Sequence, residues 1–87
     1  MEKGRFFVYV LECADGSFYT GCTSDLERRV AEHNEGKGCR YTRARKPVRL
    51  VHSEEHDSRM AAMRREREVK KLSRRQKEEM ISGLSSR

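Results

Sequence analysis

A short stretch near the start of the chain, FVYVLECADGSFYTG at Phe7 to Gly21, limits the possible folds more than any other part of the sequence. Two runs rich in aromatic and β-branched residues flank Asp15 and Gly16, a residue pair that is common in tight turns. The pattern predicts a β-hairpin with strands over residues 6–12 and 17–22.

The type of turn decides whether the two tyrosines of this hairpin lie on the same face. Side chains alternate between faces, so a shift of one residue moves one ring to the opposite side. A two-residue turn would separate the rings, whereas a three-residue loop over 14–16 with a left-handed glycine in a G1 bulge pairs Leu11 with Tyr19. In that register one face carries Tyr9, Leu11, Tyr19 and Gly21.

Length and charge narrow the class of protein. With 87 residues we expect one domain over 1–87 and a modest core within about 6–81. Charged residues make up 39% and apolar residues 34%, which approaches a disordered composition, but the apolar positions are patterned and indicate a folded chain. The net charge of +6 favours a polyanionic partner, with nucleic acid as the first candidate.

Cysteine usage and hydropathy bear on the compartment. Cys13, Cys22 and Cys39 are odd in number and lack metal-site spacing, so we expect reduced thiols rather than disulfides. The first apolar run is too short for a signal peptide and is interrupted by Glu12, and no stretch approaches about 20 apolar residues. We therefore expect a cytoplasmic protein that does not enter a membrane.

Residues 24–36 are predicted to form a helix. Ser24 and Glu27 match a capping box at its start, and a glycine ends the pattern. One side of this helix combines an apolar stripe with an arginine: Leu26, Arg29, Val30 and His33. A cation beside a buried stripe is unusual, because burying an unpaired charge costs several kcal/mol.

The next segment, 37–46, contains no acidic residue and is predicted to be a loop with at most one helical turn. Positive charge without neighbouring acidic residues favours a surface that binds phosphates over a segment that only keeps the protein soluble. The cations are Lys37, Arg40, Arg43, Arg45 and Lys46.

A third strand and two helices are predicted in the remaining sequence. Pro47 precedes the strand, 48–55, in which the even-numbered residues from 48 to 52 would share a face. One helix begins at residue 57 or 58 and ends near 72, and Ser73 with Gln76 opens another that ends near 81. The predicted fold is α/β, with a small, mainly antiparallel three-stranded sheet and flanking helices.

Some polar residues fall on faces that should be buried. In the longer C-terminal helix Glu66 lies between Ala62 and Val69, on the side that should meet the sheet. Glu66 would either form a structural ion pair with Arg29 or belong to a site. The two hairpin tyrosines, each considered alone, would more often be packing residues. His52 and His56 have no partner that the sequence suggests, so we expect them at the surface.

These residues together form a recognisable pattern. The chain resembles the GIY-YIG nuclease superfamily, and within it the short stand-alone bacterial proteins grouped with nuclease domains of excision repair and homing endonucleases. The first motif corresponds to residues 7–9 and the second to residues 19–21, and the resemblance extends over about 6–81. The family's functional positions correspond to Tyr9, Tyr19, Arg29, His33 and Glu66.

The resemblance implies a metal-dependent endonuclease that hydrolyses nucleic-acid phosphodiester bonds, with DNA a better candidate than RNA. It implies one Mg²⁺ or Mn²⁺ ion held by Glu66, and Arg29 stabilising charge on the phosphate. One phenol would help to deprotonate the attacking water and the other would hold the phosphate or that water in line, with His33 accepting or relaying the proton. The cations expected on the nucleic-acid backbone are Lys37, Arg40, Arg43 and Arg45.

Two other functions are open to this sequence. The first is a nucleic-acid-binding module of the same fold with weak or no cleavage, which the small size, the high charge and the altered motifs favour. Phe7 replaces the glycine of the first motif, Thr20 the isoleucine of the second, and Cys22 stands where some relatives carry a lysine. The second is a basic protein that docks on an acidic protein, for which the sequence gives no positive signal.

Overall fold

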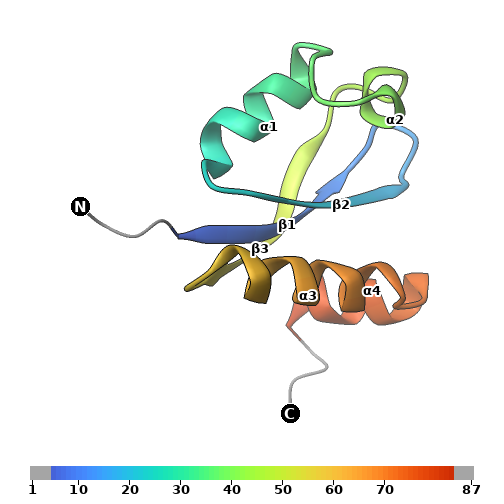
Figure 1. The fold of residues 1–87 in the computed structure, drawn as a ribbon. Coiled ribbons are helices and arrows are strands. Elements are labelled where there is room, and N and C mark those ends of the chain that lie inside the picture. Colours follow the sequence, from blue (N-terminus) through green and yellow to red (C-terminus); the bar gives the residue numbers. More distant parts are fainter. Residues whose placement is uncertain (1–4, 84–87) are drawn as a thin grey trace.

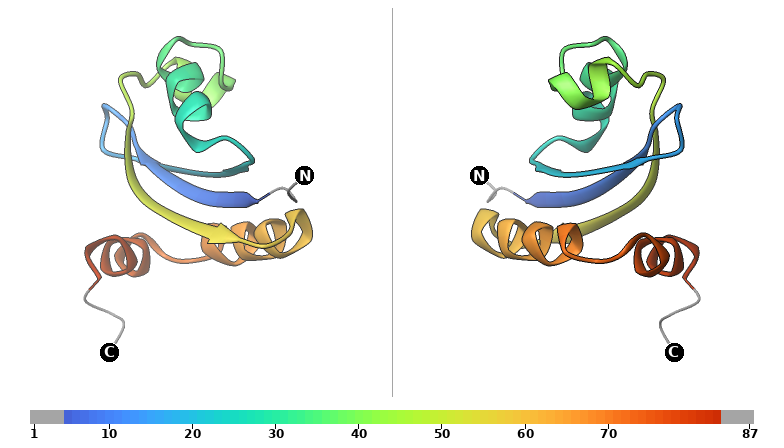
Figure 2. Two further views of the ribbon diagram at one scale, coloured as in Figure 1. Left: turned by 90° about the vertical axis from the view of Figure 1, so that its left-hand side faces the viewer. Right: turned by 90° about the vertical axis from the view of Figure 1, so that its right-hand side faces the viewer.

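The computed structural model describes residues 5–83 and has a three-stranded sheet between two pairs of helices (Figures 1 and 2). The strand order is β2-β1-β3 and both pairings are antiparallel, which confirms the predicted fold. Helices α1 and α2 cover one face of the sheet, and α3 and α4 cover the other. The elements are β1 (Phe6–Glu12), β2 (Phe18–Thr23), α1 (Leu26–Asn34), α2 (Arg40–Arg43), β3 (Arg49–His56), α3 (Arg59–Lys70) and α4 (Arg74–Ser82).

The hairpin adopts the predicted three-residue loop. Gly16 has a φ of +85°, the left-handed conformation that this loop requires, and the Cys13 N–H donates to the Ser17 carbonyl at 2.8 Å. Tyr19 therefore pairs with Leu11. The register places both hairpin tyrosines on the face that α1 and α2 cover.

Alternation along β1 divides the interior into two cores. Val8 and Val10 face α3 and α4, while Tyr9 and Leu11 face α1 and α2, and all four are at most 1% exposed. Thr20 belongs to the first of these faces, and its hydroxyl is buried without a hydrogen-bond partner among the described residues. A buried hydroxyl that stays unpaired costs about 1–3 kcal/mol of stability.

The helix starts follow the sequence with one exception. Asp25, not Ser24, caps α1 by accepting a hydrogen bond from the Arg28 N–H at 3.2 Å, so the predicted capping box with Glu27 is wrong. The Glu27 side chain takes no part in the cap and is exposed to solvent. The Ser73 capping box at the start of α4 is confirmed. Within residues 5–83 no helix is long and apolar enough to cross a membrane.

A bulge interrupts the alternation predicted for β3. Val10 pairs with His52 but Leu11 pairs with Leu50, so Val51 is an extra residue in the ladder. Directly paired residues share a face, and successive residues of β1 face opposite ways. Leu50 and His52 therefore lie on opposite faces of the sheet, and the expectation that they share one is wrong.

The bulge directs His52 into a charged cluster that the sequence did not suggest. His52 and His56 place their Nε2 atoms 2.8 and 3.3 Å from the Glu54 carboxylate, and the Arg65 Nε lies 2.9 Å from it. The expectation of unpartnered surface histidines is thus wrong. Burial alone would raise the pKa of Glu54, but hydrogen bonds from Arg65 and His52 outweigh it and lower this pKa to about 2.

Replacing Glu54 by Gln should lower the free energy of unfolding by about 3 kcal/mol near pH 7. Because the pKa of the folded state is depressed, this stabilisation is present above pH 4.5 and is lost as the pH falls toward about 2. Urea unfolding of both proteins near pH 7 and near pH 3 measures the difference, which should shrink on acidification. Glu55→Gln is the control, because Glu55 is half exposed in its ion pair with Arg5. A difference independent of pH would contradict the assignment.

Candidate active site

Three rings meet between the sheet and α1. Tyr9 comes from β1, Tyr19 from β2 and His33 from α1, and their ring centroids lie 5.2 to 6.4 Å apart. The Tyr9 hydroxyl lies 3.0 Å from Nε2 of His33. Tyr9 is 1% exposed and His33 is fully buried, so this hydrogen bond is shielded from water.

The hydrogen-bond chain continues into α2. His33 Nδ1 lies 2.7 Å from the Thr42 hydroxyl, and that hydroxyl lies 3.4 Å from the Cys39 carbonyl, to which it can only donate. All three contacts are satisfied when Tyr9 donates to Nε2 and Nδ1 donates to Thr42. Burial and the charge of Arg29 lower the pKa of His33, which keeps this imidazole neutral near pH 7.

Two glycines allow the rings to approach the backbone this closely. A Cβ on Gly21 would lie 2.5 Å from the Tyr9 hydroxyl, and a Cβ on Gly38 would collide with the His33 ring. Gly21 belongs to the second sequence motif, but the role of Gly38 was missed. A loop glycine gives no periodic signal, and only the packed fold brings this one onto His33.

Arg29 lies beside the ring cluster at the border with solvent. Its guanidinium donates to Glu32 at 3.0 Å and to the Gly38 carbonyl at 3.2 Å, and its side chain is 29% exposed. Burial raises the pKa of the Tyr9 phenol, while the nearby Arg29 opposes that rise. The same contact with Tyr9 raises the pKa of Arg29, so Arg29 remains charged.

Glu66 approaches the site from the other face of the sheet. Its carboxylate lies 2.9 Å from Lys70 Nζ, so the alternative of an ion pair between Arg29 and Glu66 is wrong. The side chain is 21% exposed and lies against Cys22 of β2. Burial and then Glu66 raise the pKa of the Cys22 thiol. Burial is the main cause of the raised pKa of Tyr9, and Glu66 adds the smallest contribution to that rise.

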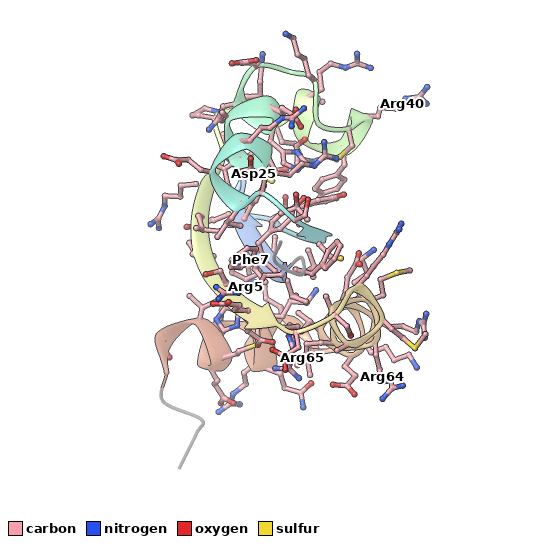
Figure 3. The ribbon with its side chains drawn as sticks, turned by 60° about the vertical axis from the view of Figure 1, so that its left-hand side comes forward. Arg5, Phe7, Asp25, Arg40, Arg64 and Arg65 are labelled. Carbon is pink, nitrogen blue, oxygen red and sulfur yellow. The ribbon has the colours of Figure 1, made fainter. Side chains whose placement is uncertain are left out.

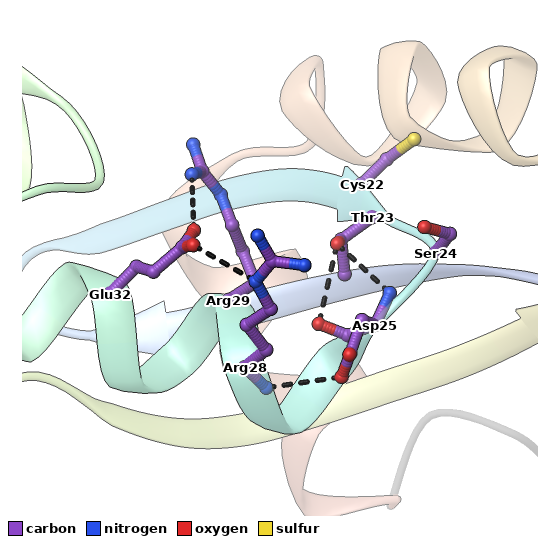
Figure 4. Close-up of a pocket in the computed structure, with 7 residues that line it drawn as sticks. All are labelled: Cys22, Thr23, Ser24, Asp25, Arg28, Arg29 and Glu32. Atoms are coloured by element: carbon purple, nitrogen blue, oxygen red, sulfur yellow. Dashed lines mark hydrogen bonds and ion pairs between the residues drawn. The ribbon is translucent and has the colours of Figure 1, made fainter.

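An open groove of about 300 Å³ runs along the end of β2 and the first turns of α1 (Figure 4). Arg29 and Cys22 are on its wall, so the groove connects the arginine with the side chain that touches Glu66. The tyrosines do not line the groove, and Tyr9 contacts Arg29 on its wall. The lining residues are Cys22, Thr23, Ser24, Asp25, Arg28, Arg29 and Glu32.

The predicted backbone-binding cations are not equivalent. Arg45 is held by Asp15 at 3.1 Å and lies 3.9 Å from the centre of the Tyr41 ring, so it stabilises the loop. Lys37 lies 3.6 Å from Glu35 in an exposed pair. The other two, Arg40 and Arg43, are exposed, and neither forms an ion pair in the part of the chain that the structure describes.

A comparison with protein families now identifies this arrangement. Residues 5–79 match the model of the GIY-YIG catalytic domain. The chain belongs to the GIY-YIG family. Among its relatives, a UPF0213 protein of Halobacterium salinarum is 60% identical over 74 residues, which cover 85% of this chain and 96% of the relative. A UPF0213 protein of Natronomonas pharaonis is 58% identical, with coverages of 87% and 89%.

Solved GIY-YIG relatives have the same fold. The solution NMR structure of a UPF0213 protein from Bacillus halodurans is 51% identical, with a TM-score of 0.60, and the match covers 94% of this chain and 87% of that one. A solution NMR structure from E. faecalis is 45% identical, with a TM-score of 0.63 and coverages of 95% and 88%. The expected resemblance to short bacterial proteins is confirmed, and the relatives also include archaeal proteins.

The donor set near the groove bears on the metal ion that the family implies. Among residues 5–83 no group of three or more His, Cys, Asp or Glu side chains is arranged to hold a metal. A single carboxylate, Glu66, fits Mg²⁺ and Mn²⁺, because Mg²⁺ keeps several waters and takes few protein ligands besides substrate phosphates. Lys70 contacts one oxygen of the carboxylate, Oε2, and leaves the second oxygen to other ligands.

Replacing Gly38 by Ala should displace the His33 ring and break the hydrogen-bond chain. We expect the free energy of unfolding to fall by about 2 kcal/mol, because a buried ring with hydrogen bonds on both sides has no free space. Chemical denaturation measures the change. Lys37→Ala is the matched control in the same loop, and its effect should stay within about 0.5 kcal/mol. Equal stability of the two variants would contradict the close contact.

Proposed function

We propose that this GIY-YIG protein is a metal-dependent endonuclease that hydrolyses nucleic-acid phosphodiester bonds, with DNA as the preferred substrate. The observation that supports the proposal most is the groove with Arg29 on its wall and Glu66 beside Cys22 at the adjoining strand edge. The whole chain would act as one domain, 1–87. Free cysteines and the lack of an apolar spanning helix within 5–83 support action in the cytoplasm.

Arg29 is assigned to the scissile phosphate. Glu32 and the Gly38 carbonyl hold the guanidinium from one side, which fixes its direction before substrate binds. A planar, permanently charged fork then meets two phosphate oxygens and stabilises the charge that builds on them in the transition state. Because the guanidinium is oriented in advance, little free energy is spent on reorienting it during the reaction.

Glu66 is assigned to the metal ion. When bound there, Mg²⁺ or Mn²⁺ would polarise the phosphate and the attacking water. Glu66 is placed for this role by α3, which packs against β1 and β2 through Ala62 and Val69. The carboxylate and the guanidinium of Arg29 thus approach one strand edge from opposite faces of the sheet.

The buried ring cluster is assigned to proton transfer and positioning. The Tyr9 hydroxyl is closed to water and meets the groove only through its contact with Arg29, so the attacking water would have to enter beside Arg29 when substrate binds. It would then give its proton to the Tyr9 oxygen while Tyr9 passes its own proton to Nε2 of His33, 3.0 Å away. Because its pKa is lowered, His33 is neutral near pH 7 and has this nitrogen free to accept. Tyr19 packs against both rings and positions them.

Glu66→Gln and Arg29→Lys should each lower metal-dependent cleavage of DNA at least about 100-fold. The first removes the charge that would hold the metal, and the second keeps a cation but loses the planar guanidinium that would meet two phosphate oxygens. Cleavage of plasmid, single-stranded DNA and RNA in Mg²⁺ or Mn²⁺ is the measurement. Glu68→Gln is the control, since Glu68 is exposed on the same helix and pairs with Arg65 at the surface. Activity that survives in the Glu66 and Arg29 variants would contradict the proposal.

The binding module without cleavage remains the second candidate, and the ion pair between Lys70 and Glu66 favours it because a cation already neutralises the carboxylate. In that case wild type binds DNA with a steep salt dependence but shows no turnover in either metal. Salt-insensitive or absent binding would instead favour an acidic protein partner. The cleavage and binding assays together separate the three functions.

Tyr9→Phe should lower the cleavage rate about 100-fold while keeping the fold, because a phenyl ring packs in the same space but cannot transfer a proton.

The lowered pKa of His33 also predicts how cleavage falls off at acidic pH. Wild-type kcat/KM should hold down to below pH 6.5, the ordinary value, and fall only when His33 becomes protonated. A midpoint above that value, or a Tyr9→Phe variant with full activity, would exclude the proposed relay.

A further inference from the structure

The outer face of α3 combines exposed thioethers with arginines. Met60 is 70% exposed and Met63 is 42% exposed, although both side chains are apolar. They line a shallow groove of about 380 Å³ together with three guanidinium groups. We call this region the α3 surface, and it consists of Arg59, Met60, Met63, Arg64 and Arg67.

The arginines of the α3 surface carry uncompensated charge. Within residues 5–83 none of Arg59, Arg64 and Arg67 takes part in an ion pair, whereas their helix neighbours Arg65 and Lys70 are each bound to a glutamate. The three guanidiniums are distributed over about 12 Å of helix. Positive charge at this density without internal partners attracts a polyanion.

The α3 surface lies beside the candidate site. Cys22 lines that groove, and the charge of Arg59 opposes the rise that burial causes in the pKa of the Cys22 thiol, so Arg59 is a neighbour of the groove. Met63 precedes Glu66 by three residues and is adjacent to it on the helix surface. A chain that leaves the groove past Glu66 therefore reaches the α3 surface next.

Nucleic acid matches both components of this surface. Phosphates suit the guanidiniums, while sugars and exposed base faces present apolar area to flexible methionine side chains. Figure 3 shows Arg40 of α2 and Arg64 of α3 on the same side of the molecule, above and below the sheet. One strand that crosses the edge of β2 can contact cations on both sides of the site.

We infer that the α3 surface binds the nucleic-acid backbone that continues beyond Glu66, with its arginines on phosphates and its methionines against sugars and bases. This inference rests on the proposed nucleic-acid substrate and extends it to a second contact region. The loop around α2 then holds the strand on one side of the site and the α3 surface holds it on the other.

The test measures binding of fluorescent DNA oligonucleotides by anisotropy without divalent metal, over a series of salt concentrations. Arg64→Gln with Arg67→Gln should weaken binding about tenfold and reduce the slope of log K against log salt by about 2. Met60→Gln with Met63→Gln should weaken binding severalfold and leave the slope unchanged, because no charge is lost. Thermal unfolding verifies that each variant is folded.

The matched control removes two charges outside the α3 surface, Arg49→Gln with Arg75→Gln, from exposed pairs on β3 and α4. Equal effects of the control and of the Arg64 and Arg67 variant would overturn the inference while wild-type cleavage and the Glu66→Gln result still support the proposed function. Polyglutamate that displaces DNA at equal charge would also overturn it, because the surface would then suit an acidic protein. Absent DNA binding by wild type would instead remove the proposed function itself.

Discussion

The contact between the Tyr9 hydroxyl and the buried His33 ring determines the arrangement of the rest of the site. It joins the central strand to α1, and the Thr42 hydroxyl on the far side of the imidazole joins α1 to α2. Because both rings are buried away from water, each of their polar atoms needs a hydrogen-bond partner within the protein. The series of hydrogen bonds from Tyr9 through His33 to Thr42 therefore tolerates little movement. Arg29 lies one helical turn before His33. It is fixed in place as a result, because α1 cannot rotate without breaking the hydrogen bonds of His33.

The candidate site belongs to the edge of the sheet rather than to one of its faces. Arg29 approaches that edge over the face that α1 and α2 cover, and Glu66 approaches it from α3 on the other face. Cys22, near the end of β2, lies between them. Each face can therefore keep an apolar core of its own while the charged groups meet at the border with solvent, where their desolvation costs least.

Local rules were sufficient for much of the fold but not for contacts made across it. The loop that ends in Gly16 set the hairpin register, so the shared face of the two tyrosines could be predicted from a few residues. The partners of Glu54 could not, because Arg65 lies eleven residues away and the bulge at Val51 changes which way His52 faces. The unusual places of Arg29 and Glu66 on apolar helix faces made them candidates, but periodicity cannot say which partner a buried charge takes.

The order of the strands leaves β2 at the margin of the sheet, and within 5–83 it pairs only with β1. An exposed edge strand of this kind is a template to which a strand from another molecule can pair. Covering it with a helix or a further strand would close the groove, so that form of protection is not available to this fold. Each copy carries a charge of +6, and the resulting repulsion between copies opposes such pairing. The charge that keeps copies apart is the same charge that would draw a polyanion to this protein.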